Sequence, residues 1–221
     1  MGKLQSSIPA AGATSSDTAI AQAYRLFWDR EGPGYLPLEQ EALAQLSARG
    51  VTGHGLDATH LTALYAYTLK HGAYCHHAQL NMGLRAGCMD TIRAFAPHIA
   101  LIMAAVRRLA TASGYGGWVH RRCDLPYDAC DLRPGVRLAD KGFLSTSAGE
   151  SSFVGWVSLH LEVDTGVNIQ RYSSAPEEEE ILLLPGFAAE ITGVRLTGED
   201  LCITARECDM QHAEDLQPMA A

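Results

Sequence analysis

The spacing of apolar side chains changes near residue 113 of this 221-residue chain. Before that point they recur every three or four positions, which predicts amphipathic helices. After it they alternate with polar residues or form short runs bounded by Pro and Gly, which predicts strands. Helices followed by strands indicate an α+β fold with an antiparallel sheet.

The helical stretches have recognisable ends. We expect helices to begin at Asp17, Pro37, Asp57, residue 73 and just after Pro97. Asp17 is a candidate N-cap, Gly50 closes the second helix, and Ser113 ends the last one. The last helix has the clearest apolar stripe, formed by Ile99, Ile102, Met103, Val106 and Leu109.

The second half contains short strand candidates separated by turn signals. They lie at 118–121, 143–147, 157–163, 181–184, 187–194 and 201–206. We expect a turn at Asp164-Thr165-Gly166 and a loop over 123–141. The resulting organisation is a disordered leader at 1–16, a helical lobe at 17–113, a β core at 114–208 and a tail at 209–221, together forming one domain.

Four consecutive glutamates, residues 177–180, run directly into the apolar segment Ile181–Leu184 and a Pro-Gly turn. If the strand begins within the acidic run, period two places Glu178 and Glu180 on one face. Two like charges held side by side at the edge of a strand are costly. The alternative is a solvated acidic loop.

Composition narrows the classes of function. With 47% hydrophobic residues and 221 positions, the chain has enough apolar material for one globular core. A formal net charge of −8 argues against nucleic acid as a partner, because phosphate binding needs a basic surface. No segment approaches the roughly 20 apolar residues of a membrane span. The six scattered cysteines indicate reduced thiols in an intracellular setting.

His71, Cys75, His76 and His77 are candidate metal ligands, and the i,i+4 spacing of His71 and Cys75 would put both side chains on one face of a helix. No second cluster offers matching ligands, so we expect no metal.

Three separated motifs resemble a known family. Arg121 ends a short strand, Ser145-Thr146-Ser147 follow about 20 residues later, and Glu178 and Glu180 precede the apolar strand. This ordered set resembles the arginine–serine–glutamate class of mono-ADP-ribosyltransferases. Tyr67-Thr68 and the segment 80–85 are similar to the helical lobe of that class, so the resemblance covers roughly residues 57–206. It implies NAD as a substrate, and an α+β fold in which an N-terminal helical lobe packs on a core of two antiparallel β-sheets.

The resemblance also implies a role for each residue of the motifs. Glu180 is expected to stabilise the oxocarbenium-like ribose, with Ser145 holding it in place. Arg121 is expected to bind the NAD phosphate, supported by Thr146 and Ser147 on the neighbouring strand. The alternatives are an Arg121 that only caps the sheet or pairs with a carboxylate, and a Ser145 that is only structural.

Two further residues of the class concern the acceptor. Glu178 is expected to orient and deprotonate it, and a glutamate at that position goes with arginine as the acceptor in this class. Tyr172, in the loop before the glutamates, occupies the place of an acceptor-recognition aromatic. An ordinary loop tyrosine is the alternative.

Within the class, the resemblance is to bacterial effectors delivered into host cells by type III secretion. It implies a host protein with an acceptor arginine as partner, and a location in the host cytoplasm or at the inner face of the host plasma membrane. Met1–Ser6 fits the myristoylation pattern with Gly2 as acceptor, or is an ordinary chain start. One acyl chain gives only weak membrane association. The oligomeric state stays open.

One position departs from the class. A glycine often follows the strand arginine, whereas this chain has Arg122, which could contact phosphate or obstruct the pocket. The alternatives to an active transferase are therefore a catalytically impaired member that binds a host protein or peptide, and an NAD glycohydrolase.

Overall fold

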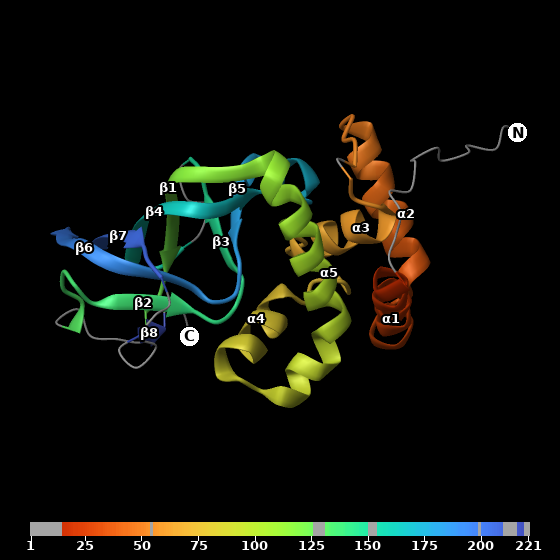
Figure 1. The fold of residues 1–221 in the computed structure, drawn as a ribbon, viewed down its shortest axis with the longest axis horizontal. Helices are drawn as coiled ribbons and strands as arrows, with labels where there is room; N and C mark the ends of the chain where they lie inside the picture. Colours follow the sequence, from red (N-terminus) through yellow and green to blue (C-terminus); the bar gives the residue numbers. More distant parts are fainter. Residues whose placement is uncertain are drawn as a thin grey trace, which may run out of the picture.

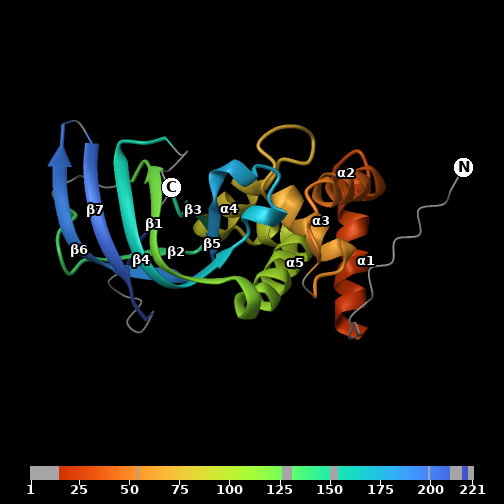
Figure 2. The same ribbon diagram turned by 90° about the horizontal axis from the view of Figure 1, so that it is seen from above.

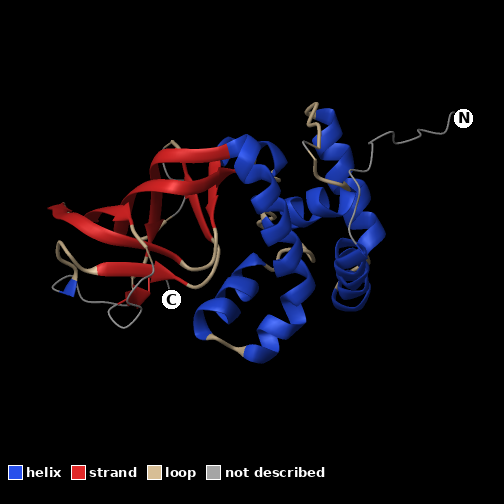
Figure 3. Cartoon of the chain, in the orientation of Figure 1, coloured by secondary structure: helices blue, strands red, loops and turns tan. Residues whose placement is uncertain are grey.

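The computed structural model describes residues 15–53, 55–125, 131–149, 154–198, 200–209 and 216–218. Helices come first, and Figure 3 shows them segregated from the strands, as expected for an α+β fold. The helices are α1 (Ser15–Glu31), α2 (Tyr35–Ala48), α3 (Ala58–Tyr67), α4 (His77–Ala86) and α5 (Met89–Ser113). Two short 3-10 turns, η2 (Gln170–Tyr172) and η3 (Pro176–Glu178), lie among the strands.

Helix α5 joins the two halves of the molecule. In Figures 1 and 2 it lies between the sheet and helices α1, α2 and α3, with α4 on the side of the sheet. Its buried stripe includes Leu101, Ile102 and Val106. Helix α3 is buried over nearly its whole surface and begins where Asp57 accepts a hydrogen bond from the His60 amide at 3.0 Å.

The strands are β1 (Gly114–Cys123), β2 (Arg137–Asp140), β3 (Leu144–Ser147), β4 (Val157–Asn168), β5 (Glu180–Leu183), β6 (Phe187–Thr197), β7 (Asp200–Glu207) and β8 (Leu216–Pro218). They form one hydrogen-bonded network in the order β1-β3-β5-β4-β7-β6-β2-β8, with a further β1–β4 pairing. The α+β prediction is confirmed. The strands differ from the expected pair of antiparallel sheets because β4–β7 and β2–β8 are parallel.

Several helix boundaries differ from the prediction. Helix α5 begins at Met89 and carries Pro97 inside it, because buried Phe95 and His98 hold the chain helical on both sides of the proline. Asp17 lies within α1 instead of capping it, and pairs with Arg108 at 2.8 Å. The second helix starts two residues before Pro37, at Tyr35.

The fourth helix begins at His77, four residues later than expected. His71 and Cys75 therefore lie before it, and the i,i+4 argument for a shared helix face was wrong. The segment 70–76 is irregular and includes Gly72 at φ +93°.

The predicted turn at Asp164-Thr165-Gly166 was wrong, because β4 continues through it to Asn168. Gly166 pairs with Tyr115 of β1. A Cβ atom at residue 166 would lie 2.8 Å from Ile181 Cγ2, so this glycine allows close packing instead of reversing the chain. The loop predicted over 123–141 likewise contains β2.

The acidic run also folds differently from the period-two prediction. Glu178 ends the 3-10 turn η3, Glu179 takes a left-handed conformation with φ 49°, and β5 begins only at Glu180. The two glutamates therefore do not share a strand face by alternation.

Among the described residues, α5 is the helix long and apolar enough to cross a membrane by length and composition. One third of its most apolar 18-residue window is buried, where the apolar stripe packs inside the lobe and against β4.

Candidate active site

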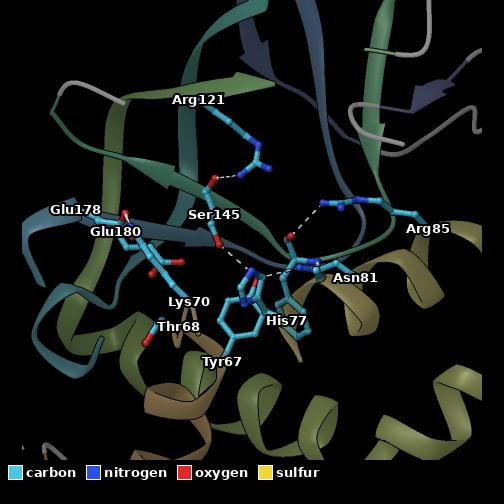
Figure 4. Close-up of a pocket in the computed structure, with 12 residues that line it drawn as sticks. Tyr67, Thr68, Lys70, His77, Asn81, Arg85, Arg121, Ser145, Glu178 and Glu180 are labelled. Atoms are coloured by element: carbon cyan, nitrogen blue, oxygen red, sulfur yellow. Dashed lines mark hydrogen bonds and ion pairs between the residues drawn. The ribbon is translucent and has the colours of Figure 1, made fainter. Parts of the chain in front are cut away.

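A cavity of about 270 Å³ opens at the junction of the helical lobe and the β core. Figure 4 shows the side chains that surround it. It is lined by Tyr67, Thr68, Lys70, His77, Ala78, Asn81, Arg85, Arg121, Phe143, Ser145, Glu178 and Glu180. Four of the residues predicted from the motifs, Arg121, Ser145, Glu178 and Glu180, are in this set.

Three adjacent strands bring the motif residues together. Arg121 comes from β1, Ser145 from β3 and Glu180 from β5, and the register pairs Ser147 with both His120 and Glu180. Arg121 donates a hydrogen bond from Nη1 to the Ser145 carbonyl at 2.6 Å. Residues more than 20 positions apart in sequence therefore meet because β3 pairs with both β1 and β5.

Glu180 is a buried carboxyl group, with 5% of the residue exposed. Burial, together with the charge of the nearby Glu178, raises its pKa to about 7, although a hydrogen bond from Ser145 and the charges of Arg121 and Lys70 oppose the rise. The expected coupling between the two glutamates is present, but burial is the larger cause. Near neutral pH both the protonated and the ionised form of this group are populated.

A chain of hydrogen bonds approaches Glu180 from the helical lobe. The Phe143 amide donates to Asn81 Oδ1 at 2.9 Å, and Asn81 Nδ2 donates to the Tyr67 oxygen at 3.1 Å. The Tyr67 hydroxyl lies 3.3 Å from Ser145 Oγ. Because the Tyr67 oxygen already accepts a hydrogen bond, its proton is available to Ser145, whose own proton is then free to reach Glu180.

Tyr67 is itself buried, and burial together with the Glu180 charge raises its pKa to about 12, so it remains a hydroxyl donor. Sequence reasoning placed Tyr67 and Asn81 in the lobe without assigning them to the site. The sequence did carry one signal for them, because both lie in the two helical stretches that resemble the family.

Glu178 approaches the cavity from η3. Its side chain is 12% exposed and forms an ion pair with Lys70, from the segment between α3 and α4. The left-handed conformation of Glu179 turns the chain between them, so Glu178 and Glu180 both line the cavity despite their different backbone environments.

Arg85 and His77 were also not foreseen. Arg85 makes two 2.9 Å hydrogen bonds to the buried Asp140 carboxylate and so joins α4 to β2. His77 begins α4, and burial lowers its pKa, which favours the neutral ring. The contact between Arg85 and Asp140 joins segments 55 positions apart, which no local pattern reveals.

Three predicted residues do not reach the cavity lining. The buried Thr146 hydroxyl donates to the Ile181 carbonyl at 2.7 Å and ties β3 to β5. Ser147 is also buried, on the same strand. Tyr172 is fully buried in the core shared with the helical lobe. Their predicted roles at the NAD phosphate and the acceptor stay predictions, and Gly2 lies outside the described residues.

Arg122 does not obstruct the cavity. Neighbouring residues of a strand point to opposite faces, so Arg122 projects away from Arg121. It makes hydrogen bonds of 2.7 and 2.9 Å to the Asp200 carboxylate and also donates to the Gly155 carbonyl. The concern about this departure from the class was therefore wrong.

The helical lobe, the β core and the Arg–Ser–Glu cavity between them define the class of mono-ADP-ribosyltransferases. A family model described as NAD:arginine ADP-ribosyltransferase matches residues 6–211. The chain belongs to this family, which confirms the resemblance inferred from the motifs.

Individual relatives have only moderate or low sequence identity to this chain. Mav of Mycobacterium avium (strain 104), to which NAD(+)–arginine ADP-ribosyltransferase activity is ascribed, is 32% identical over 139 residues, or 60% of this chain. This chain matches only 16% of Mav's length.

Two solved structures share the fold. The ADP-ribosyltransferase HopU1 of Pseudomonas syringae pv. Tomato DC3000 superposes with a TM-score of 0.67 at 18% identity, covering 90% of this chain and 100% of that one. The type III effector XopAI of Xanthomonas axonopodis pv. citri gives 0.65 at 17% identity, covering 89% of each chain.

Proposed function

We propose that this chain transfers ADP-ribose from NAD to the guanidinium group of an arginine on a protein. The observation that carries the proposal is the meeting of Arg121, Ser145, Glu178 and Glu180 at one cavity. The family to which the chain belongs is named for this donor and this acceptor.

The cavity has the chemistry that NAD requires. Arg121 is a cation suited to the diphosphate, because a guanidinium matches phosphate oxygens with several donors. Tyr67 and Phe143 line the cavity with aromatic side chains, against which a ring can pack. Glu180 offers a fixed negative charge to the ribose, where positive charge develops as nicotinamide leaves.

The transfer balances with the groups present. The bond between ribose C1 and the nicotinamide nitrogen breaks, and nicotinamide leaves as a neutral molecule. A guanidinium nitrogen forms the new bond to C1 and loses one proton. Glu178 is the base that takes this proton, since its carboxylate lines the same cavity as Glu180.

The acceptor arginine is proposed to belong to a host protein, and the chain to act as an effector inside the host cell. Its fold is shared with the type III effector XopAI, and the resemblance noted from the motifs supports the same setting. Attachment of an acyl chain to Gly2 would add weak affinity for the inner face of the plasma membrane.

Labelled NAD and the arginine analogue agmatine test the proposal. Wild-type protein is expected to form ADP-ribosyl-agmatine. Glu180→Gln is expected to lose activity by about 10²-fold or more, in line with the loss of a group that stabilises developing charge. Glu177→Gln, the same change at an exposed neighbouring position, is expected to retain it.

The products distinguish the alternatives. Nicotinamide release without labelled agmatine or labelled host protein would favour a glycohydrolase. Neither product, together with no NAD binding, would leave a binding protein on a transferase scaffold and overturn the proposal.

A further inference from the structure

Lys70 contacts Glu178, the carboxylate that the acceptor is proposed to bind. Lys70 projects from the irregular segment between α3 and α4 and forms an ion pair with Glu178. Figure 4 shows its side chain beside both Glu178 and Glu180. The Lys70 side chain is 51% exposed, so it can leave Glu178 for solvent without disrupting the core.

The two segments that carry this pair are fastened together. The Ser174 amide donates to Thr68 Oγ1 at 2.7 Å, and Ser174 Oγ donates to the Thr68 carbonyl at 2.7 Å. Thr68 lies two residues before Lys70, and Ser174 lies four residues before Glu178. These two hydrogen bonds hold the segments that carry Lys70 and Glu178 beside each other, so the ammonium group can reach the carboxylate.

We propose that Lys70 competes with the acceptor for the Glu178 carboxylate. An incoming arginine must displace the lysine from Glu178 before it can bind there. This inference rests on the proposed function, in which Glu178 receives the guanidinium. Both cations use the same carboxylate oxygens, so they exclude one another. A guanidinium can bind a carboxylate through two parallel hydrogen bonds, whereas an ammonium acts as a point charge, so exchange favours arginine.

The strength of the competition follows from the exposure of the pair. The Lys70 side chain is 51% exposed and the Glu178 side chain 12% exposed. An ion pair whose cation reaches solvent is worth little, and the equilibrium between paired and unpaired Lys70 weakens any competing cation by about two- to sixfold. An internal competitor weakens all cationic acceptors by the same factor. Acceptors that already bind Glu178 weakly then bind too weakly to react, whereas a well-placed arginine still binds.

Binding of agmatine, measured by calorimetry without NAD, tests the inference separately from catalysis. Lys70→Gln is expected to bind agmatine about two- to sixfold more tightly than wild type. Lys141→Gln removes the same charge from an exposed residue outside the cavity lining and is expected to leave the affinity unchanged. Glu178→Gln is expected to bind agmatine more weakly than wild type.

Unchanged or weaker binding by Lys70→Gln, or no detectable agmatine binding by that variant, would overturn the inference. The dependence of NAD cleavage on pH provides a second measurement. Because the Lys70 charge lowers the pKa of Glu180, the acid limb of the Lys70→Gln profile is expected at higher pH. Absence of transferase activity in wild type would instead contradict the proposed function, whatever the binding data show.

Discussion

At the scale of single residues, the Glu180 carboxyl group serves the chemistry of the site, and its ionised form lowers the stability of the fold. Its burial raises the pKa from 4.5 to about 7, so the folded protein prefers the neutral form over a range in which the unfolded chain is ionised. Stability from this preference is fully present below pH 4.5 and is lost as pH rises through about 7. The ionised form that catalysis needs is the less stable one.

Glu180→Gln is therefore expected to unfold less readily than wild type at neutral and alkaline pH. The amide cannot ionise, so the difference in the free energy of unfolding should grow between pH 5 and 7 and reach about 3 kcal/mol above pH 8. Urea denaturation across this range measures it. Glu177→Gln, at an exposed position, should show no such trend, and a pH-independent difference for Glu180→Gln would contradict the account.

Tyr67→Phe is expected to raise the pKa of Glu180. Without the tyrosine proton, the Ser145 hydroxyl is no longer directed toward Glu180, and the ionised carboxylate loses stabilisation. The acid limb of kcat/KM for NAD should move to higher pH. Tyr65→Phe removes a hydroxyl of the same helix that bonds Glu41 at 3.1 Å and should leave the profile in place. Identical profiles for both variants would exclude the hydrogen-bond chain.

At the scale of elements, the sequence pattern predicted those helix and strand features that are set by interactions between neighbouring residues. The cap of α3 at Asp57 and the alternation of β4 were predictable because both depend on neighbouring residues. The continuation of β4 through Gly166 was not, because pairing with β1 overrides a turn-like sequence. Glu178 and Glu180 were expected to lie together, and they do, although the reason is the turn at Glu179 and not strand alternation.

Gly166→Ala is expected to destabilise the protein by about 1–3 kcal/mol, as overpacking usually does. The added methyl group would lie 2.8 Å from Ile181 Cγ2, next to the catalytic strand β5. Thermal denaturation measures the change. Gly116→Ala is the control, because its added Cβ would meet only the Val163 carbonyl at 3.7 Å. Equal stabilities of the two variants would mean that Gly166 is not required for packing.

At the scale of the molecule, the cavity lies where the helical lobe meets the β core, and residues of both halves line it. The strand residues of the site could be predicted because their motifs follow a family order. Lys70 and Arg85 could not, since each contacts a residue more than 50 positions away, Glu178 and Asp140 respectively. Their importance depends on how α4 and the preceding segment dock onto the strands.

Arg85→Met tests the docking of the two halves. It would leave the Asp140 carboxylate buried with no exposed surface and without its cation, so a loss of about 3 kcal/mol or more is expected. Arg206→Met breaks a surface pair with Glu162 and should cost less than about 1 kcal/mol. Chemical denaturation compares them, and a small loss for Arg85→Met would show that the pair does not hold the lobe to the core.

The most direct test of the central claim is the partition of ADP-ribose between agmatine and water in Glu178→Gln. If Glu180 serves bond cleavage and Glu178 serves the acceptor, transfer to agmatine should fall by about 10²-fold while nicotinamide release to water changes little. Glu179→Gln, at the exposed residue between them, should retain both reactions. Equal loss of both reactions in Glu178→Gln, or full retention of transfer, would contradict this division of roles.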